Sequence, residues 1–465
     1  MRPRLLAGPL ALALPLLLAG PLACGPTVIV LDDDAALRDD PDLKAGCTSD
    51  VWSKAIASVA GPNPASLAAG PGCTAVVVGS FRSPMDFGAG TMTSAGGADV
   101  FLAKLGPAGE VLWSTRLGGP GDEQAARVAV GRDGSIAVAI HTGVGDVSTG
   151  AASAYVTWFD SQGTQVREQP LGKLLAPVRI TGMAMDRDGA TAVTGYFQGG
   201  VDFGGGEVSS AGLDDIFVAR YEPDGSLGFI RTFGDTSHQS GAGGLALDGE
   251  GNIFTTGSFR GTLNFDDGSV TNGGDEDVYL VKLNPAGDTL WARTFGDLGH
   301  QEAAPIAVSR EGRVAIAGTF EGELDFGGSL LQSTEGHHFN LFVAQLDADG
   351  EHRFSLRFGD VHAEEAIGLG FAPEGHLVLA GHFGGSMVIG DQGFVTKGAW
   401  DLFAVRFDQA GTPVASRQFG DQYAQRCEGL AVDPLGQVLM TGTFEGALDF
   451  GHGAGPLTAT PEDAD

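Results

Sequence analysis

Aspartates recur at one place in this sequence, directly after Phe-Gly or after glycine alone. Asp235, Asp297, Asp360 and Asp421 follow Phe-Gly, and Asp122 follows glycine. Hard cations such as Ca²⁺ prefer carboxylate oxygens, so a ring of such side chains could bind calcium or a basic ligand. The alternative is that each carboxylate accepts hydrogen bonds from its own loop. We treat the five aspartates as a candidate acidic binding rim, with calcium as its candidate cofactor.

Histidines follow three of these aspartates. His238, His300 and His362 lie two or three residues further on. Imidazole and carboxylate together suit zinc, but ligands on separate repeats would have to converge on one ion. The sequence leaves the identity of any metal unknown. HExxH, GxSxG and GxxxxGK[ST] are absent, so we assign no catalytic residue. A site assembled from several repeats leaves no local motif, so the enzyme question stays open, with a non-enzyme favoured.

The elements that position these residues belong to a unit of about sixty residues, which repeats from about Cys47 to the C-terminus. One copy contains four apolar strand patterns, at Gly244–Asp248, Ile253–Phe259, Val278–Leu283 and Leu290–Gly296. We call these the first to fourth strands of a repeat. Four-residue turns that end on glycine separate the first strand from the second and the third from the fourth. Such turns make antiparallel hairpins, so each repeat predicts a four-stranded blade of a β-propeller.

The turn glycines recur in six repeats. Between the first and second strands they are Gly134, Gly189, Gly251, Gly312, Gly375 and Gly436, and between the third and fourth strands they are Gly109, Gly163, Gly225, Gly287, Gly350 and Gly411.

The spacing of the second strands predicts the number of blades. These strands end at Gly79, Ile140, Gly195, Gly257, Gly318, Gly381 and Gly442, 55 to 63 residues apart, which predicts seven blades.

The two chain ends are expected to share the closing blade, which removes the free sheet edge. Trp52 precedes Gly79 by 27 residues, as Trp291 precedes Gly318, so Trp52–Ala57 is a fourth strand placed before the first complete blade. The third strand of this blade is missing, and we favour a three-stranded closing blade. The alternatives are that Thr27–Leu31 fills the gap or that the chain is truncated.

Cysteine placement predicts one disulfide. Cys47 enters the closing strand, and Cys73 follows the first turn of the first blade. These turns lie on the same face of neighbouring blades, so a Cys47–Cys73 bond would pin the closing strand. Cys427 precedes a first strand on the opposite face and is expected to be free.

Composition excludes some partners. The net charge is −31, and only 18 % of the 465 residues are charged, while 75 are glycine. Nucleic acid and anionic lipid surfaces need clustered Lys and Arg, so neither is an expected direct partner. Cations or basic proteins would be attracted, and the charge also serves solubility.

The N-terminus predicts export. Residues 1–23 hold Arg2, Arg4 and an apolar run, as in a secretory signal peptide. The segment LLLAGPLAC resembles a bacterial lipoprotein signal in which Cys24 is lipidated, and cleavage by an ordinary signal peptidase is the alternative. Residues 24–46 would be an acidic spacer and 47–465 the propeller. The expected location is the cell envelope, as an outer-membrane or periplasmic lipoprotein, or the protein is secreted.

The repeat resembles a known family. The pattern DVFLAKLGPAGEVLWSTRLGG at Asp99–Gly119, with the strands that follow it, is similar to the bacterial seven-bladed β-propeller (SBBP) repeat and covers nearly all of residues 48–460. The resemblance implies a secreted or surface-exposed bacterial protein, frequently a lipoprotein, and supplies no catalytic motif. We therefore expect a membrane-anchored binding or scaffolding module. A carboxylate-based hydrolase or lyase in the central funnel is the alternative.

Overall fold

The computed structural model describes residues 27–31, 47, 52–58, 63–88, 90–143, 153–172, 176–239, 241–266, 268–334, 339–359, 364–451 and 455–459. Almost every element is a β-strand, and the single short helix η1 (Pro71–Cys73) is a 3-10 turn. Among the described residues, no helix is long and apolar enough to span a membrane.

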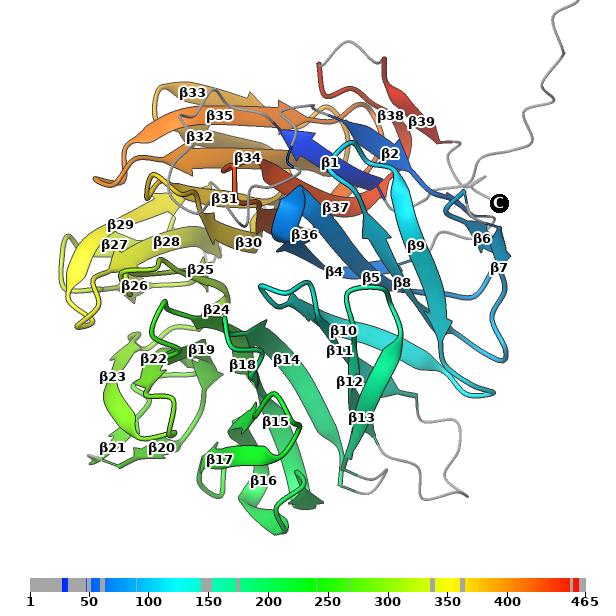
Figure 1. Ribbon diagram of the computed structural model, residues 1–465. Coiled ribbons are helices and arrows are strands. Elements are labelled where there is room, and N and C mark those ends of the chain that lie inside the picture. The colour runs from blue at the N-terminus through cyan, green and yellow to red at the C-terminus, as the bar shows by residue number, and fades with distance from the viewer. Residues whose placement is uncertain are drawn as a thin grey trace, which may run out of the picture.

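Six four-stranded antiparallel sheets are each built from one continuous stretch of chain and stand around a common centre (Figure 1). This is the architecture of a β-propeller, so the predicted all-β propeller with four-stranded antiparallel blades is confirmed, but the predicted number of seven blades is not. In chain order the blades are β4 (Asn63–Gly70), β5 (Thr74–Phe81), β8 (Asp99–Leu105), β9 (Val111–Leu117); β10 (Glu123–Val130), β11 (Ile136–Thr142), β12 (Ala154–Phe159), β13 (Gln165–Leu171); β14 (Val178–Met185), β15 (Thr191–Asp202), β16 (Glu207–Tyr221), β17 (Leu227–Phe233); β18 (Gly241–Leu247), β19 (Ile253–Phe259), β22 (Asp277–Leu283), β23 (Thr289–Phe295); β24 (Gln301–Val308), β25 (Val314–Phe320), β28 (Asn340–Leu346), β29 (His352–Phe358); and β30 (Glu364–Phe371), β31 (Leu377–Phe383), β34 (Asp401–Phe407), β35 (Pro413–Phe419).

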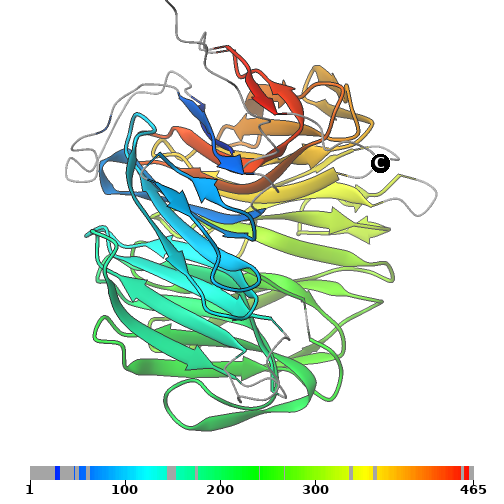
Figure 2. The ribbon, with the colours of Figure 1, turned by 90° about the vertical axis from the view of Figure 1, so that its right-hand side faces the viewer.

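A further four-stranded sheet joins the two chain ends, so six blades rather than seven are built from a continuous stretch of chain. Its order is β2 (Ser53–Ala55), β1 (Thr27–Leu31), β37 (Val438–Phe444) and β36 (Gln425–Val432). β1 pairs with β37 from Thr27 opposite Gly442 to Leu31 opposite Val438, and the dark blue strand lies beside the red one in Figures 1 and 2.

The favoured three-stranded closing blade was therefore wrong. β1 satisfies the backbone groups of β37 that a missing third strand would have left open. Part of the segment 24–46, which we took for a spacer, is thus a strand.

Short hairpins follow the second strands of several sheets. They are β20 (Thr262–Phe265) with β21 (Gly268–Thr271), β26 (Glu323–Leu324) with β27 (Leu331–Gln332), β32 (Ser386–Ile389) with β33 (Gln392–Val395), β38 (Gly446–Leu448) with β39 (Leu457–Ala459), and β6 (Met85–Asp86) with β7 (Thr91–Met92), to which β3 (Ala57–Ser58) adds a third strand.

The predicted turn glycines have the conformation that the turns need. All of the turn glycines named above have a positive φ, between 79° and 93°. This left-handed conformation costs glycine nothing, whereas other residues seldom adopt it. In the first blade Cys73 takes the equivalent place, and it is the one non-glycine residue with positive φ (53°) among the described residues. The two hairpins of each blade are therefore specified locally by the sequence.

Aromatic side chains on several of the fourth strands fasten one blade to the next. Trp291 Nε1 donates a hydrogen bond to the Ala348 carbonyl of the following blade (3.0 Å), and a Cβ on Gly350 would lie 3.3 Å from the same indole. Trp52, from the N-terminal end of the chain, repeats this contact with the Pro107 carbonyl of the first blade (3.0 Å). The contact therefore joins the closing sheet to the first blade as it joins other neighbouring blades.

Candidate functional site

The two ends of the central channel are formed by different connections. Each first strand is innermost in its sheet, and the turn that follows it lies at one end of the channel, which we call the turn mouth. The loops that lead from a fourth strand into the next first strand lie at the other end, which we call the loop mouth.

The predicted acidic rim lies at the loop mouth, and its carboxylates hold their own loops. Asp297 Oδ1 accepts hydrogen bonds from Gly299 N (2.7 Å) and Gln301 Nε2 (2.8 Å), and its Oδ2 accepts one from Glu323 N (2.8 Å). Asp421 repeats this set with Tyr423, Gln425 and Ala447. Each carboxylate thus ties the loop that follows it to the start of a hairpin.

Asp235 shows the same arrangement through Ser237, Gln239 and Thr262. Burial alone would raise the pKa of Asp235, but these hydrogen bonds stabilise the charged form and leave the pKa below its usual value.

The remaining predicted rim residues differ. Asp122 accepts a hydrogen bond from Ala98 N (2.7 Å) and pairs with Arg82 (2.9 Å), while Asp360 lies outside the described residues. Within the described part of the chain, no group of three or more His, Cys, Asp or Glu side chains is placed to hold a metal ion. Calcium binding at this rim stays a prediction.

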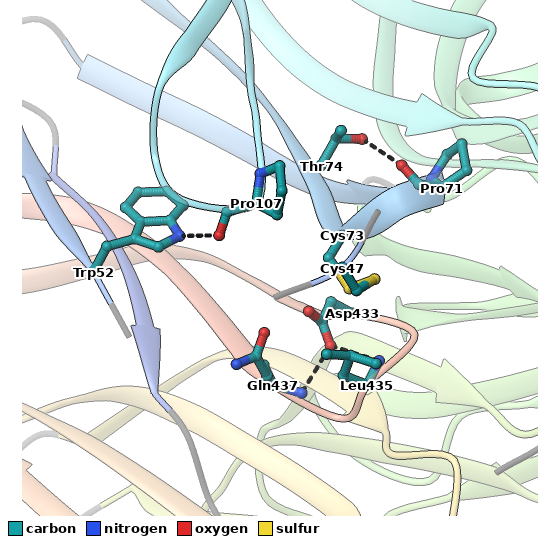
Figure 3. The surroundings of a disulfide bond; sticks show 9 residues. All are labelled: Cys47, Trp52, Pro71, Cys73, Thr74, Pro107, Asp433, Leu435 and Gln437. Carbon is teal, nitrogen blue, oxygen red and sulfur yellow. Dashed lines mark hydrogen bonds between the residues drawn. A yellow bond between two sulfur atoms is a disulfide. The ribbon is translucent and has the colours of Figure 1, made fainter. Parts of the chain in front are cut away.

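The structure contains the Cys47–Cys73 disulfide, with the sulfur atoms 2.07 Å apart. Figure 3 shows it at the turn mouth, between the turn of the first blade at Pro71 and Thr74 and the turn of the closing sheet at Asp433 and Leu435. Asp433 accepts hydrogen bonds from Leu435 N and Gln437 N (both 2.8 Å), which fixes that second turn. Cys427 is a free, buried thiol, and burial raises its pKa to about 12.

A cavity of about 1060 Å³ opens at the turn mouth. Its apolar wall comes from the ends of the innermost strands, one residue from each sheet: Ala69, Val130, Met185, Leu247, Val308, Phe371 and Val432. Its volume lies just above the range typical of ligand pockets, about 300–1,000 Å³.

The rim of the cavity has two unlike halves. Two residues beyond each apolar wall residue, the turns carry Arg132, Arg187, Gly249 and Arg310 in four consecutive blades. The next blade, the closing sheet and the first blade carry Pro373, Pro434 and Pro71 at that place. All three arginines are exposed. One half of the mouth therefore presents guanidinium groups among carboxylates, and the other half presents rigid apolar rings.

Acidic side chains also line the cavity, but several are engaged within the protein. Asp186 pairs with the buried Arg220 (2.8 Å), Asp248 lies 3.9 Å from Lys282, and Glu311 pairs with Arg313 (3.3 Å). Asp188 and Glu250 are exposed at the rim. Local pairing thus offsets much of the negative charge that the composition leads one to expect here.

A second polar cluster lies nearer the loop mouth, between the last continuous blade and the closing sheet. His382 Nε2 lies 3.2 Å from Glu365 Oε2, and the Trp400 and His382 rings pack nearly perpendicular to one another (5.1 Å between centroids). The hydrogen bond from His382 lowers the pKa of Glu365, whereas burial raises the pKa of Glu428 on the adjacent innermost strand.

Sequence analysis missed the arginine half of the turn mouth. The turns GRDG, DRDG and SREG contain Arg132, Arg187 and Arg310. The last glycine of these turns recurs and predicts the hairpin. The second residue of the turn varies: it is arginine in three of the aligned turns and proline in three others, and this difference was the available signal.

Comparison with known proteins adds little to the structure. No family model matches the chain. Regulatory protein FlaEY of Caulobacter vibrioides is 32 % identical over 153 residues, which is 32 % of this chain and 16 % of that protein. The chain therefore spans about a sixth of the length of this relative.

Solved structures show weak similarity. Sqt1 from Chaetomium thermophilum is 12 % identical with a TM-score of 0.42, covering 83 % of this chain and 96 % of the other. The gluconolactonase XC5397 from Xanthomonas campestris is 14 % identical with a TM-score of 0.34, over 78 % and 95 %. These similarities are too weak to support an argument about activity. The class, an all-β propeller, is defined by the sheets themselves.

Proposed function

We propose that this protein is a binding module whose ligand occupies the cavity at the turn mouth. The observation that carries the proposal is the cavity itself: about 1060 Å³, with an apolar wall drawn from every sheet and a charged rim. Ligand sites combine an apolar lining with a few placed polar groups, and this mouth has both. The loop mouth supports the proposal less well, because the described aspartates there are engaged in fixing loops.

A closed ring would hold this cavity rigid. We propose that the sheet formed by β2, β1, β37 and β36 acts as a seventh blade, as in proteins with the SBBP repeat. In support, β36 contacts β30 on one side and β4 on the other, so it lies where the ring would otherwise open. The disulfide and the Trp52 contact brace the same junction.

Soaking crystals of the mature protein in several small organic solvents tests the binding function without knowledge of the ligand. We expect the solvent molecules to accumulate in the turn-mouth cavity. Val308→Trp, which fills the wall, should displace them, while Val414→Trp on the exposed fourth strand β35 should not. An even scatter over the surface, or accumulation elsewhere, would refute a binding site at this mouth.

We further propose that Cys24 is lipidated and tethers the propeller to a membrane in the cell envelope. The support is the lipoprotein-like segment that ends at Cys24, and two or more acyl chains are enough for stable anchoring. Expression in a bacterium with a labelled fatty acid tests it. The wild-type protein should take up the label and sediment with membranes, and Cys24→Ser should do neither. Label-free, soluble wild-type protein would favour ordinary secretion.

One observation favours the alternative of a carboxylate enzyme. Glu365 and Glu428 lie on neighbouring innermost strands with pKa values displaced in opposite directions, which is the pattern of an acid–base pair. A panel of chromogenic glycosides and esters tests it. Turnover that is lost in both Glu365→Gln and Glu428→Gln, but kept in Glu302→Gln, would establish this function. Absence of turnover in the wild type would count against it.

A further inference from the structure

We propose that the turn-mouth cavity binds an organic carboxylate with an apolar body, seated with its carboxylate on the arginine half and its apolar part against the proline half. This inference rests on the binding function proposed above and specifies the class of ligand.

The arginine half can supply the charge-assisted hydrogen bonds that a carboxylate needs. A guanidinium group has five N–H donors in a planar fork that matches a carboxylate, and it stays charged at any physiological pH. Arg187 donates one bond, from Nη2, to the Gly249 carbonyl, and Gly249 N in turn approaches the Arg310 carbonyl (3.4 Å). Gly249 lies between the two arginine turns and places no side chain between Arg187 and Arg310.

Arg220 is the second, independent observation. It lies in the wall of the same cavity and is 92 % buried, with 8 % of its surface exposed. Its Nη2 pairs with Asp186 and its Nε with Glu222 (3.3 Å), but its buried Nη1 has no hydrogen-bond acceptor among the described residues. Nη1 is closed off from the cavity in this conformation, so a ligand oxygen could accept from it only after the side chain shifts toward the cavity. A buried N–H group without an acceptor costs about 1–3 kcal/mol, which favours such a shift.

The proline half of the mouth favours a ligand with an apolar part over a small inorganic anion. Pro71, Pro373 and Pro434 line it, and Phe371 and Val432 continue the apolar surface inward. These groups gain free energy by covering apolar area of a ligand, at about 25 cal/mol per Å². A ligand charged at one end and apolar at the other satisfies both halves at once.

Three probes that share one body separate charge from shape: 3-phenylpropionate, 3-phenylpropanol and 3-phenylpropylamine. Their dissociation constants are measured by NMR titration in low salt, at pH 7, with the mature protein. We expect the carboxylate to bind at least tenfold more tightly than the alcohol, and the amine more weakly than either.

Matched variants assign the effect to the arginine half. Arg187→Gln combined with Arg310→Gln should bring the carboxylate to within about twofold of the alcohol and leave the alcohol unchanged. Arg293→Gln, on the outer strand β23, should change nothing. Because both cavity arginines are exposed, the double variant should keep the wild-type melting temperature, which shows that it folds.

Equal affinity for the three probes, tightest binding of the amine, or no binding of any probe would each overturn this inference. The solvent soaks remain a separate readout. Solvents that gather in the cavity while the carboxylate shows no advantage would leave the binding function standing and discard the ligand class. Solvents that avoid the cavity would discard both.

Discussion

The two mouths of the channel carry charge in opposite ways. At the loop mouth the aspartates recur from repeat to repeat, and Asp297 and Asp421 accept the same three hydrogen bonds within their own surroundings. At the turn mouth Arg132, Arg187 and Arg310 occupy a position that is proline in three other sheets. A residue that recurs and bonds its own loop serves the fold of the repeat. A residue that breaks the pattern is a better candidate for binding a ligand.

The largest expected effect is the loss of stability when the disulfide at the turn mouth is removed. Removing the Cys47–Cys73 bond by Cys47→Ser should lower the free energy of unfolding by about 3–4 kcal/mol, from the entropy of the 26-residue loop that it closes. Cys73→Gly also removes the bond but places glycine at the positive φ, so it should cost about 1 kcal/mol less. Chemical denaturation of both variants measures the difference. Equal losses would mean that the backbone at residue 73 carries no strain.

Acid should weaken the region near the loop mouth through His141. Burial, followed by Arg179 and Arg127, lowers the pKa of His141 to about 4, and its Nε2 accepts a hydrogen bond from Ile180 N (2.8 Å). A histidine whose folded pKa is depressed stabilises the fold above its unfolded pKa of about 6.5, and this contribution is lost as pH falls toward 4. We expect a loss of about 3 kcal/mol over that window.

The substitution His141→Gln tests this acid effect. Gln keeps a hydrogen-bond acceptor for Ile180 N, so the variant should lose the dependence of stability on pH between pH 6.5 and 4. A slope that survives in His141→Gln would assign it to other groups.

Aspartate substitutions compare the two mouths directly. Asp297→Ala leaves three donors without their acceptor, so it should lower the free energy of unfolding by about 2 kcal/mol. Asp188→Ala at the exposed rim of the turn mouth should change it by less than about 0.5 kcal/mol. Denaturation curves with a common slope measure both. A larger loss for Asp188→Ala than for Asp297→Ala would mean that the carboxylate at the turn mouth, and not the one at the loop mouth, stabilises the fold.

The sequence was sufficient for those parts of the fold that are specified locally. The pattern at Ile253–Phe259 is strand β19 to the residue, and every turn glycine that we named has the expected positive φ. For β1 it left alternatives open: Thr27–Leu31 was one candidate for the gap, but it pairs with a strand more than four hundred residues away and no turn connects them. Four apolar residues and a threonine beside an acidic run do not indicate which strand they will join.

The candidate site was harder still to predict. The cavity is formed by residues that are distant in the chain, and Arg132, Arg187 and Arg310 become neighbours only when the sheets are arranged around the channel. Repetition drew attention to the aspartates instead, and the structure shows four of them bonded within or beside their loops. In a repeat protein, aligned positions are best compared for what differs among them.

The smallest expected effect is that of calcium on the loop mouth. Calcium takes about six to eight oxygen ligands. The carboxylates of Asp235, Asp297 and Asp421 each already accept three hydrogen bonds. Millimolar calcium should therefore move the melting temperature by less than about 1 °C, compared with magnesium at the same ionic strength. A saturable rise with calcium alone, lost in Asp297→Asn, would show that these carboxylates bind ions as well as hold loops. The two mouths would then differ in the charge of the ligand that each binds, with a cation at the loop mouth and a carboxylate at the turn mouth.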